Sequence, residues 1–158
     1  MDFSIPIFVV EYATLLIIFL LTISHPERVV RAIQMFSIAT LARTMSIYYF
    51  ALEPPREMVL LYDPIANIFL NTKEAYVTKD LFFSGHVAAL SLLTLVTVNK
   101  YVKIWATLAT MLVSIMIMWQ HVHYSMDVLI APLVAYVSYK FVLYVHRETR
   151  YGLELQEA

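Results

Sequence analysis

The sequence predicts an all-α fold, a polytopic transmembrane helical bundle of about five spans, and three observations support it. Of the 158 residues, 61% are hydrophobic and 15% are charged, whereas soluble domains average about 45–50% and about 25%. Five apolar stretches are each long enough to cross roughly 30 Å of hydrocarbon, and none alternates like a barrel strand. They cover residues 5–23, 29–52, 81–98, 102–121 and 123–145. We expect one integral membrane domain over residues 1–158.

The charges between these stretches predict their orientation. The first Lys or Arg is Arg28, which follows the first stretch, so we expect that stretch to be a retained span and not a cleaved signal peptide. Basic residues gather at alternate connections, on one side of the membrane: Arg28, Arg31, Lys100, Lys103, Arg147 and Arg150. Cytoplasmic segments collect Lys and Arg. We therefore expect the amino terminus outside and the carboxyl terminus inside.

The long connection 53–80 lies on the outer side in this topology. Pro54-Pro55 and Asp63-Pro64 interrupt helix formation there. The apolar residues between these signals favour a position in the membrane interface, and we expect the connection to form a lid.

Two features of the composition exclude other classes of protein. The net charge is −1 and the basic residues are scattered, so no basic stripe is present to bind nucleic acid. The chain has no cysteine, which excludes disulfides, cysteine-ligated zinc and thiol catalysis.

Six charged residues fall inside the apolar stretches. Three of them lie near cytoplasmic ends, where long side chains reach the headgroups, so we interpret Arg31, Lys103 and Lys140 as snorkelling residues. The other three are candidates for a site because an ionisable group at depth is costly. They are Glu11, Arg43 and Asp127, and the sequence assigns no role to Glu11.

Histidines lie at the same expected depth as these groups. His123 and Asp127 are four residues apart, which places them on one helix face if both are helical. A carboxylate there can fix one imidazole tautomer and leave the other nitrogen as a base or nucleophile; a purely structural cap of the helix start is the alternative. His86 follows Ser84 and Gly85, and a glycine at a helix start lets an anion approach closely. Helix packing is the alternative reason for that glycine.

A metal site is a further alternative at these histidines. His121 and His123 could bind one ion together with Asp127 and His86. Residues i and i+2 diverge by about 200° on a helix, so this requires an irregular turn. We expect no metal and no cofactor.

Segments 80–86 (DLFFSGH) and 121–127 (HVHYSMD) resemble motifs of the sphingomyelin synthase branch of the type 2 phosphatidic acid phosphatase superfamily. Arg31 and Arg43 lie in a stretch that is similar to the arginine-containing segment of that family. The resemblance covers about residues 28–146. The phosphatase motifs K-x6-R-P and S-R-x5-H-x3-D are absent, because Met116 and Ile117 occupy the Ser-Arg positions.

The resemblance implies a membrane-embedded lipid phosphotransferase that moves a phosphate-containing head group between lipids through a histidine-linked intermediate. His86, His123 and Asp127 would be catalytic, and the phosphate would be held by Arg43, Ser84 and Gly85. Residues expected to support these groups are Asp80, His121 and Tyr124. The substrates would be phospholipids or sphingolipids that reach an active site on the extracytoplasmic side. The alternatives are a lipid phosphate phosphatase or phospholipase C-like hydrolase that uses water, and a silent lipid-binding protein.

Overall fold

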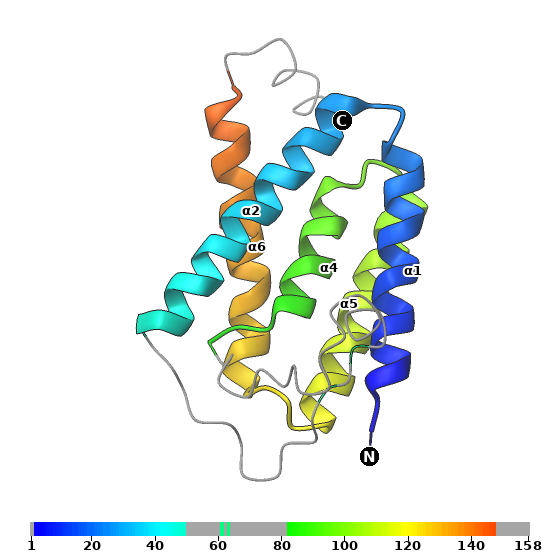
Figure 1. The fold of residues 1–158 in the computed structure, drawn as a ribbon. Helices are drawn as coiled ribbons and strands as arrows, with labels where there is room; N and C mark the ends of the chain where they lie inside the picture. Colours follow the sequence, from blue (N-terminus) through cyan, green and yellow to red (C-terminus); the bar gives the residue numbers. More distant parts are fainter. Residues whose placement is uncertain (1, 50–60, 62, 64–81, 148–158) are drawn as a thin grey trace.

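The computed structural model describes residues 2–49, 61, 63 and 82–147, which form five α-helices and no strand. Successive helices run in alternating directions along the bundle (Figure 1). The helices are α1 (Ser4–Thr22), α2 (Pro26–Tyr49), α4 (Gly85–Val96), α5 (Lys100–Trp119) and α6 (Ser125–Val145). We call the end of the bundle where α1, α4 and α6 begin the first end, and the end where α2 and α5 begin the second end. The predicted all-helical class is confirmed.

Local capping sets helix bounds that differ from the expected stretches. Ser84 has an extended backbone and its Oγ accepts a hydrogen bond from Val87 N (3.4 Å), which starts α4. Asn99 caps α5 in the same way through Tyr101 N (2.9 Å). Within the expected span 81–98, the helix α4 has only 12 residues and rises only about 18 Å.

Three helices are long and apolar enough to cross a membrane, namely α1, α5 and α6. α2 has 24 residues, but Gln34, Arg43 and several hydroxyl side chains make it less apolar. α4 is too short to cross alone. The five-span count and the orientation of the termini thus stay predictions.

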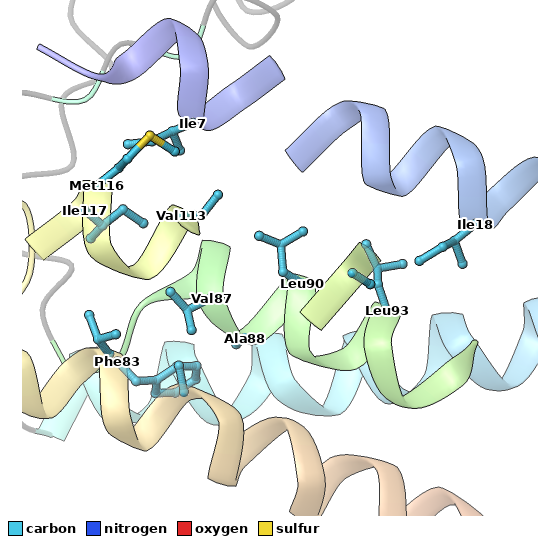
Figure 2. Packing of buried hydrophobic residues seen from close by; sticks show 13 residues of the cluster. Ile7, Ile18, Phe83, Val87, Ala88, Leu90, Leu93, Val113, Met116 and Ile117 are labelled. Carbon is cyan, nitrogen blue, oxygen red and sulfur yellow. The ribbon is translucent and has the colours of Figure 1, made fainter. Parts of the chain in front are cut away.

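The short helix α4 occupies the centre of the bundle and packs against α1, α2, α5 and α6. Leu90 of α4 is fully buried in a cluster that also contains Ile7 of α1 and Val113 of α5 (Figure 2). Phe83, just before α4, is buried in the same cluster. This burial fixes the start of α4 relative to its neighbours.

A polar cluster fastens the start of α1 to the end of α5. Gln120 is fully buried, and its Oε1 accepts a hydrogen bond from Phe3 N (3.0 Å). Its Nε2 donates to Ser4 Oγ and Asp2 Oδ1, each at 3.4 Å. This cluster was not predicted from the sequence, because glutamine at a helix end carries no distinctive signal.

Candidate active site

A backbone hydrogen bond joins the two histidine-containing segments at the first end of the bundle. Ser84 N donates to the carbonyl oxygen of Asp127 at 3.2 Å. The start of α4 is therefore fixed against the start of α6. Ser84 itself is fully buried, and its hydroxyl is used to cap α4.

His123 and Asp127 form a buried pair. Nδ1 of His123 lies 3.3 Å from Oδ2 of Asp127, and the two side chains are only 6% and 3% exposed. α6 begins at Ser125, so His123 precedes the helix and the expectation of one shared helix face is wrong. The carboxylate reaches back from the first turn and also accepts a hydrogen bond from Tyr124 N (3.0 Å). Asp127 thus caps the helix and also contacts the imidazole. The structural cap and the orientation of His123, which the sequence offered as alternatives, are both present.

His86 faces a second carboxylate, that of Glu11. Nε2 of His86 lies 3.9 Å from Oε2 of Glu11, and the side chains are 24% and 15% exposed. The imidazole also packs against the Phe8 ring, with centroids 5.2 Å apart. At this distance the groups interact electrostatically without forming a hydrogen bond. Glu11, the intramembrane acid to which the sequence assigned no role, therefore belongs to the site.

Arg43 of α2 approaches the site through Gly85. A Cβ atom built at Gly85 would overlap Nη1 of Arg43 and would lie 2.6 Å from its Cζ. The guanidinium therefore lies against the first residue of α4, in the space that any other side chain would fill. Arg43 also interacts electrostatically with Glu11. The structure thus brings Arg43 next to Gly85, the residue that precedes His86.

Two residues of the long connection 53–80 are described, and both contact the helices. Leu61 packs against the central hydrophobic cluster. Asp63 accepts hydrogen bonds from Tyr12 Oη to both carboxylate oxygens, at 3.1 and 3.0 Å. The remainder of the expected lid, with Asp80, lies outside the described residues.

The two other residues expected to support the site, His121 and Tyr124, are exposed. His121 is exposed and adopts a left-handed backbone (φ 55°), which makes the turn before α6 irregular. Tyr124 is 45% exposed, and its backbone N–H contacts Asp127. Within residues 2–49, 61, 63 and 82–147, no three His, Cys, Asp or Glu side chains are grouped to hold a metal ion.

The interpretation of Arg31 as a snorkelling residue is wrong. Its side chain turns into the bundle and the residue is only 4% exposed. The reason is its position on the face of α2 that packs against α4 and α6. Lys103 and Lys140 are exposed, as expected.

An apolar groove of about 660 Å³ runs along α1, α2 and α4. Thr40, Leu41 and Thr44 line it beside Arg43, and Thr22 and Val29 line it toward the second end. Its volume and apolar lining fit a hydrocarbon chain better than a water-soluble ligand.

Comparison with known proteins identifies a family for the second half of the chain. No curated protein and no solved structure matches the sequence. The family model described as PAP2 superfamily C-terminal matches residues 79–146, a range that contains His86, His123 and Asp127. Glu11 and Arg43 lie outside it. Residues 79–146, the part of the chain with both histidine-containing segments, are thus similar to proteins of the PAP2 superfamily.

Proposed function

We propose that the chain is a lipid phosphotransferase of the sphingomyelin synthase-like type, which moves a phosphate-containing head group between lipids. The observation that carries the proposal is the convergence of two histidine–carboxylate pairs with the guanidinium of Arg43 at one end of the bundle. A tightly oriented imidazole suits a nucleophile, a looser one suits a proton carrier, and a guanidinium suits phosphate oxygens.

In the first half-reaction, Nε2 of His123 attacks the phosphorus of the donor lipid. A P–N bond forms as the P–O bond to the lipid alcohol breaks, and His86 gives a proton to the departing oxygen. Asp127 holds the proton on Nδ1 of His123, which leaves Nε2 as the attacking atom and stabilises the charged imidazole. Arg43 binds the non-bridging oxygens as their charge grows.

In the second half-reaction, an acceptor hydroxyl gives its proton to His86 and its oxygen attacks the phosphorus. The P–N bond breaks and His123 is regenerated. Glu11 offsets the positive charge that His86 carries before the first half-reaction and regains in the second, because its carboxylate faces that ring. The acceptor decides the reaction: a lipid alcohol gives transfer, whereas water gives hydrolysis. The family match favours hydrolysis as the second candidate.

Two observations support a lipid substrate and an extracytoplasmic site, and a third supports transfer. The apolar groove passes beside Arg43 and offers a place for an acyl chain. Basic residues flank the second end of the bundle, at the starts of α2 and α5 and after α6: Arg28, Arg31, Lys100, Lys103 and Arg147. Because cytoplasmic segments collect Lys and Arg, we expect the second end to face the cytoplasm. The first end, which holds the histidines, would then face the opposite side. The absence of the phosphatase motifs favours transfer over hydrolysis.

The test uses purified full-length protein in lipid nanodiscs with a head-group-labelled phospholipid, with and without ceramide or diacylglycerol. We expect labelled lipid product only when an acceptor is present, and at least about 10⁴-fold loss of turnover in His123→Ala. Release of a water-soluble labelled product instead supports hydrolysis. Turnover that survives His123→Ala contradicts the role of this residue, and a wild-type protein inactive on every lipid supports the silent alternative.

A further inference from the structure

A small cavity with basic residues in its lining lies at the second end of the bundle, away from both histidine pairs. Its volume is about 50 Å³, several times the roughly 10–15 Å³ that holds one water molecule. It lies between the start of α2, the α4–α5 turn, the start of α5 and the end of α6. The lining residues are Arg28, Arg31, Met35, Leu95, Val96, Thr97, Val98, Lys103 and Tyr139.

The charge of this cavity is uniformly positive. Arg28, Arg31 and Lys103 line it, and among the described residues no Asp or Glu does. Three like charges around one small space repel each other. An anion between them relieves that repulsion, so the cavity favours a negatively charged ligand.

Two buried polar atoms at the cavity have unused hydrogen-bonding capacity. Nη2 of Arg31 has no hydrogen-bond partner among the described residues, although Arg31 is 96% buried, and the same is true of Oγ1 of Thr97, which is 94% buried. A buried guanidinium without compensation is strongly unfavourable. Both side chains line the cavity, so a ligand there would accept from Arg31 and exchange a hydrogen bond with Thr97.

We propose that this cavity binds a phosphate-bearing anion, with Arg31 and Thr97 as buried contacts and with Arg28 and Lys103 at its rim. Guanidinium groups bind phosphate oxygens through two parallel hydrogen bonds. The site is separate from the one that holds Arg43, and it does not depend on the proposed catalysis.

The surroundings of the cavity favour the head group of an anionic lipid over a free ion. A neighbouring hollow of about 290 Å³ shares Arg28 and Thr97 with the cavity. That hollow in turn shares Ile18 and Thr22 with the long apolar groove along α1 and α2. A lipid could therefore place its phosphate in the cavity and its acyl chains along the groove.

The test measures binding to the full-length protein that carries His123→Ala and Arg43→Gln, so that the candidate active site neither turns over nor holds phosphate. Nanodiscs of phosphatidylcholine with phosphatidic acid are followed by native mass spectrometry of the retained lipid, and inorganic phosphate is added separately in a thermal shift assay. Arg31→Gln and the half-buried Arg28→Gln are compared with Lys140→Gln, an exposed basic residue toward the same end.

We expect preferential retention of phosphatidic acid, about tenfold or more weaker in Arg31→Gln and Arg28→Gln and unchanged in Lys140→Gln. In a second outcome, inorganic phosphate stabilises the protein in a way that depends on the same two arginines, without any preference for phosphatidic acid. That result supports the site with free phosphate as its ligand. Binding of neither probe, or equal binding to all variants, overturns the proposal. Arg28→Gln keeps the test decisive if Arg31→Gln fails to fold. Binding that appears only after removal of residues 148–158 makes that segment the occupant and also overturns it.

Discussion

The two histidine–carboxylate pairs at the first end of the bundle differ in how firmly they are held. His123 and Asp127 are 3.3 Å apart and almost fully buried, and the carboxylate is also fixed by a backbone N–H. His86 and Glu11 are 3.9 Å apart and partly exposed. The residues of the first pair are close in sequence, at the start of α6. The residues of the second pair come from α1 and α4 and meet where these helices pack. One imidazole is therefore held close to its carboxylate, whereas the other faces its carboxylate at a longer distance and is more exposed.

This difference assigns different chemistry to the two rings. A nucleophile must present one nitrogen along one line to the phosphorus, so it benefits from a fixed tautomer and a rigid partner. A proton carrier must serve a departing oxygen and then an arriving one, so it benefits from freedom and partial exposure. The pairs are thus complementary, and each of the following changes tests one half of the comparison.

Asp127→Asn should give the largest effect, with turnover reduced about 10²–10⁴-fold. An asparagine can still accept from Tyr124 N, but it no longer holds the proton on Nδ1 of His123. Because asparagine also caps helices well, the melting temperature should change little. Steady-state turnover with a thermal melt measures both. Unchanged turnover would show that Asp127 serves only as a helix cap.

Gly85→Ala should reduce turnover about 10²–10³-fold, because the new methyl group displaces the guanidinium of Arg43. Arginine is flexible, so the fold should survive the change. Arg43→Gln should have a similar effect, and the double variant should lose little more than either single one. Fully additive losses would mean that the two residues act independently.

The sequence contained most of the chemistry of the site but not its three-dimensional grouping. Segments 80–86 and 121–127 pointed to His86, His123 and Asp127 because their spacing is distinctive. The expected starts of α4 and α6 are four and two residues too early. At α4 the reason is that the apolar Phe82 and Phe83 extend the hydrophobic run ahead of the capping Ser84. Glu11 could be noted only as a costly charge, because its partner is 75 residues away and the pairing depends on how α1 packs.

Arg31 shows that the depth of a charged residue along a helix does not determine its surroundings. Snorkelling was the natural interpretation of an arginine one to two turns from a helix start, because depth along a helix follows from sequence. Direction around the helix follows from packing, and here the packing of α2 against α4 and α6 turns the side chain inward. The cavity at the second end could therefore be recognised only in the structure.

Glu11→Gln should reduce turnover about tenfold, since it removes the charge that faces His86 but leaves a looser pair that never formed a hydrogen bond. The pH dependence of kcat/KM should change as well, which a purely structural role of Glu11 would not cause. Glu11→Asp, which restores the charge, should recover part of the turnover. A loss as large as that of Asp127→Asn would show that the two pairs are equally tight during catalysis.

Asp2→Asn should have the smallest effect and serves as the control carboxylate, because Asp2 faces no histidine. Hydrogen bonds from the Ser4 hydroxyl and backbone N–H lower the pKa of Asp2 below its usual 3.8. A lowered pKa in the folded state contributes stability above about pH 4, and this contribution is lost as the pH falls through the folded value. Melting temperatures of the variant and the wild type should therefore differ slightly at pH 6 and converge toward pH 3, with turnover at neutral pH unchanged. A loss of turnover in Asp2→Asn would mean that any carboxylate at the first end supports activity, and the distinction between the two histidine pairs would no longer hold.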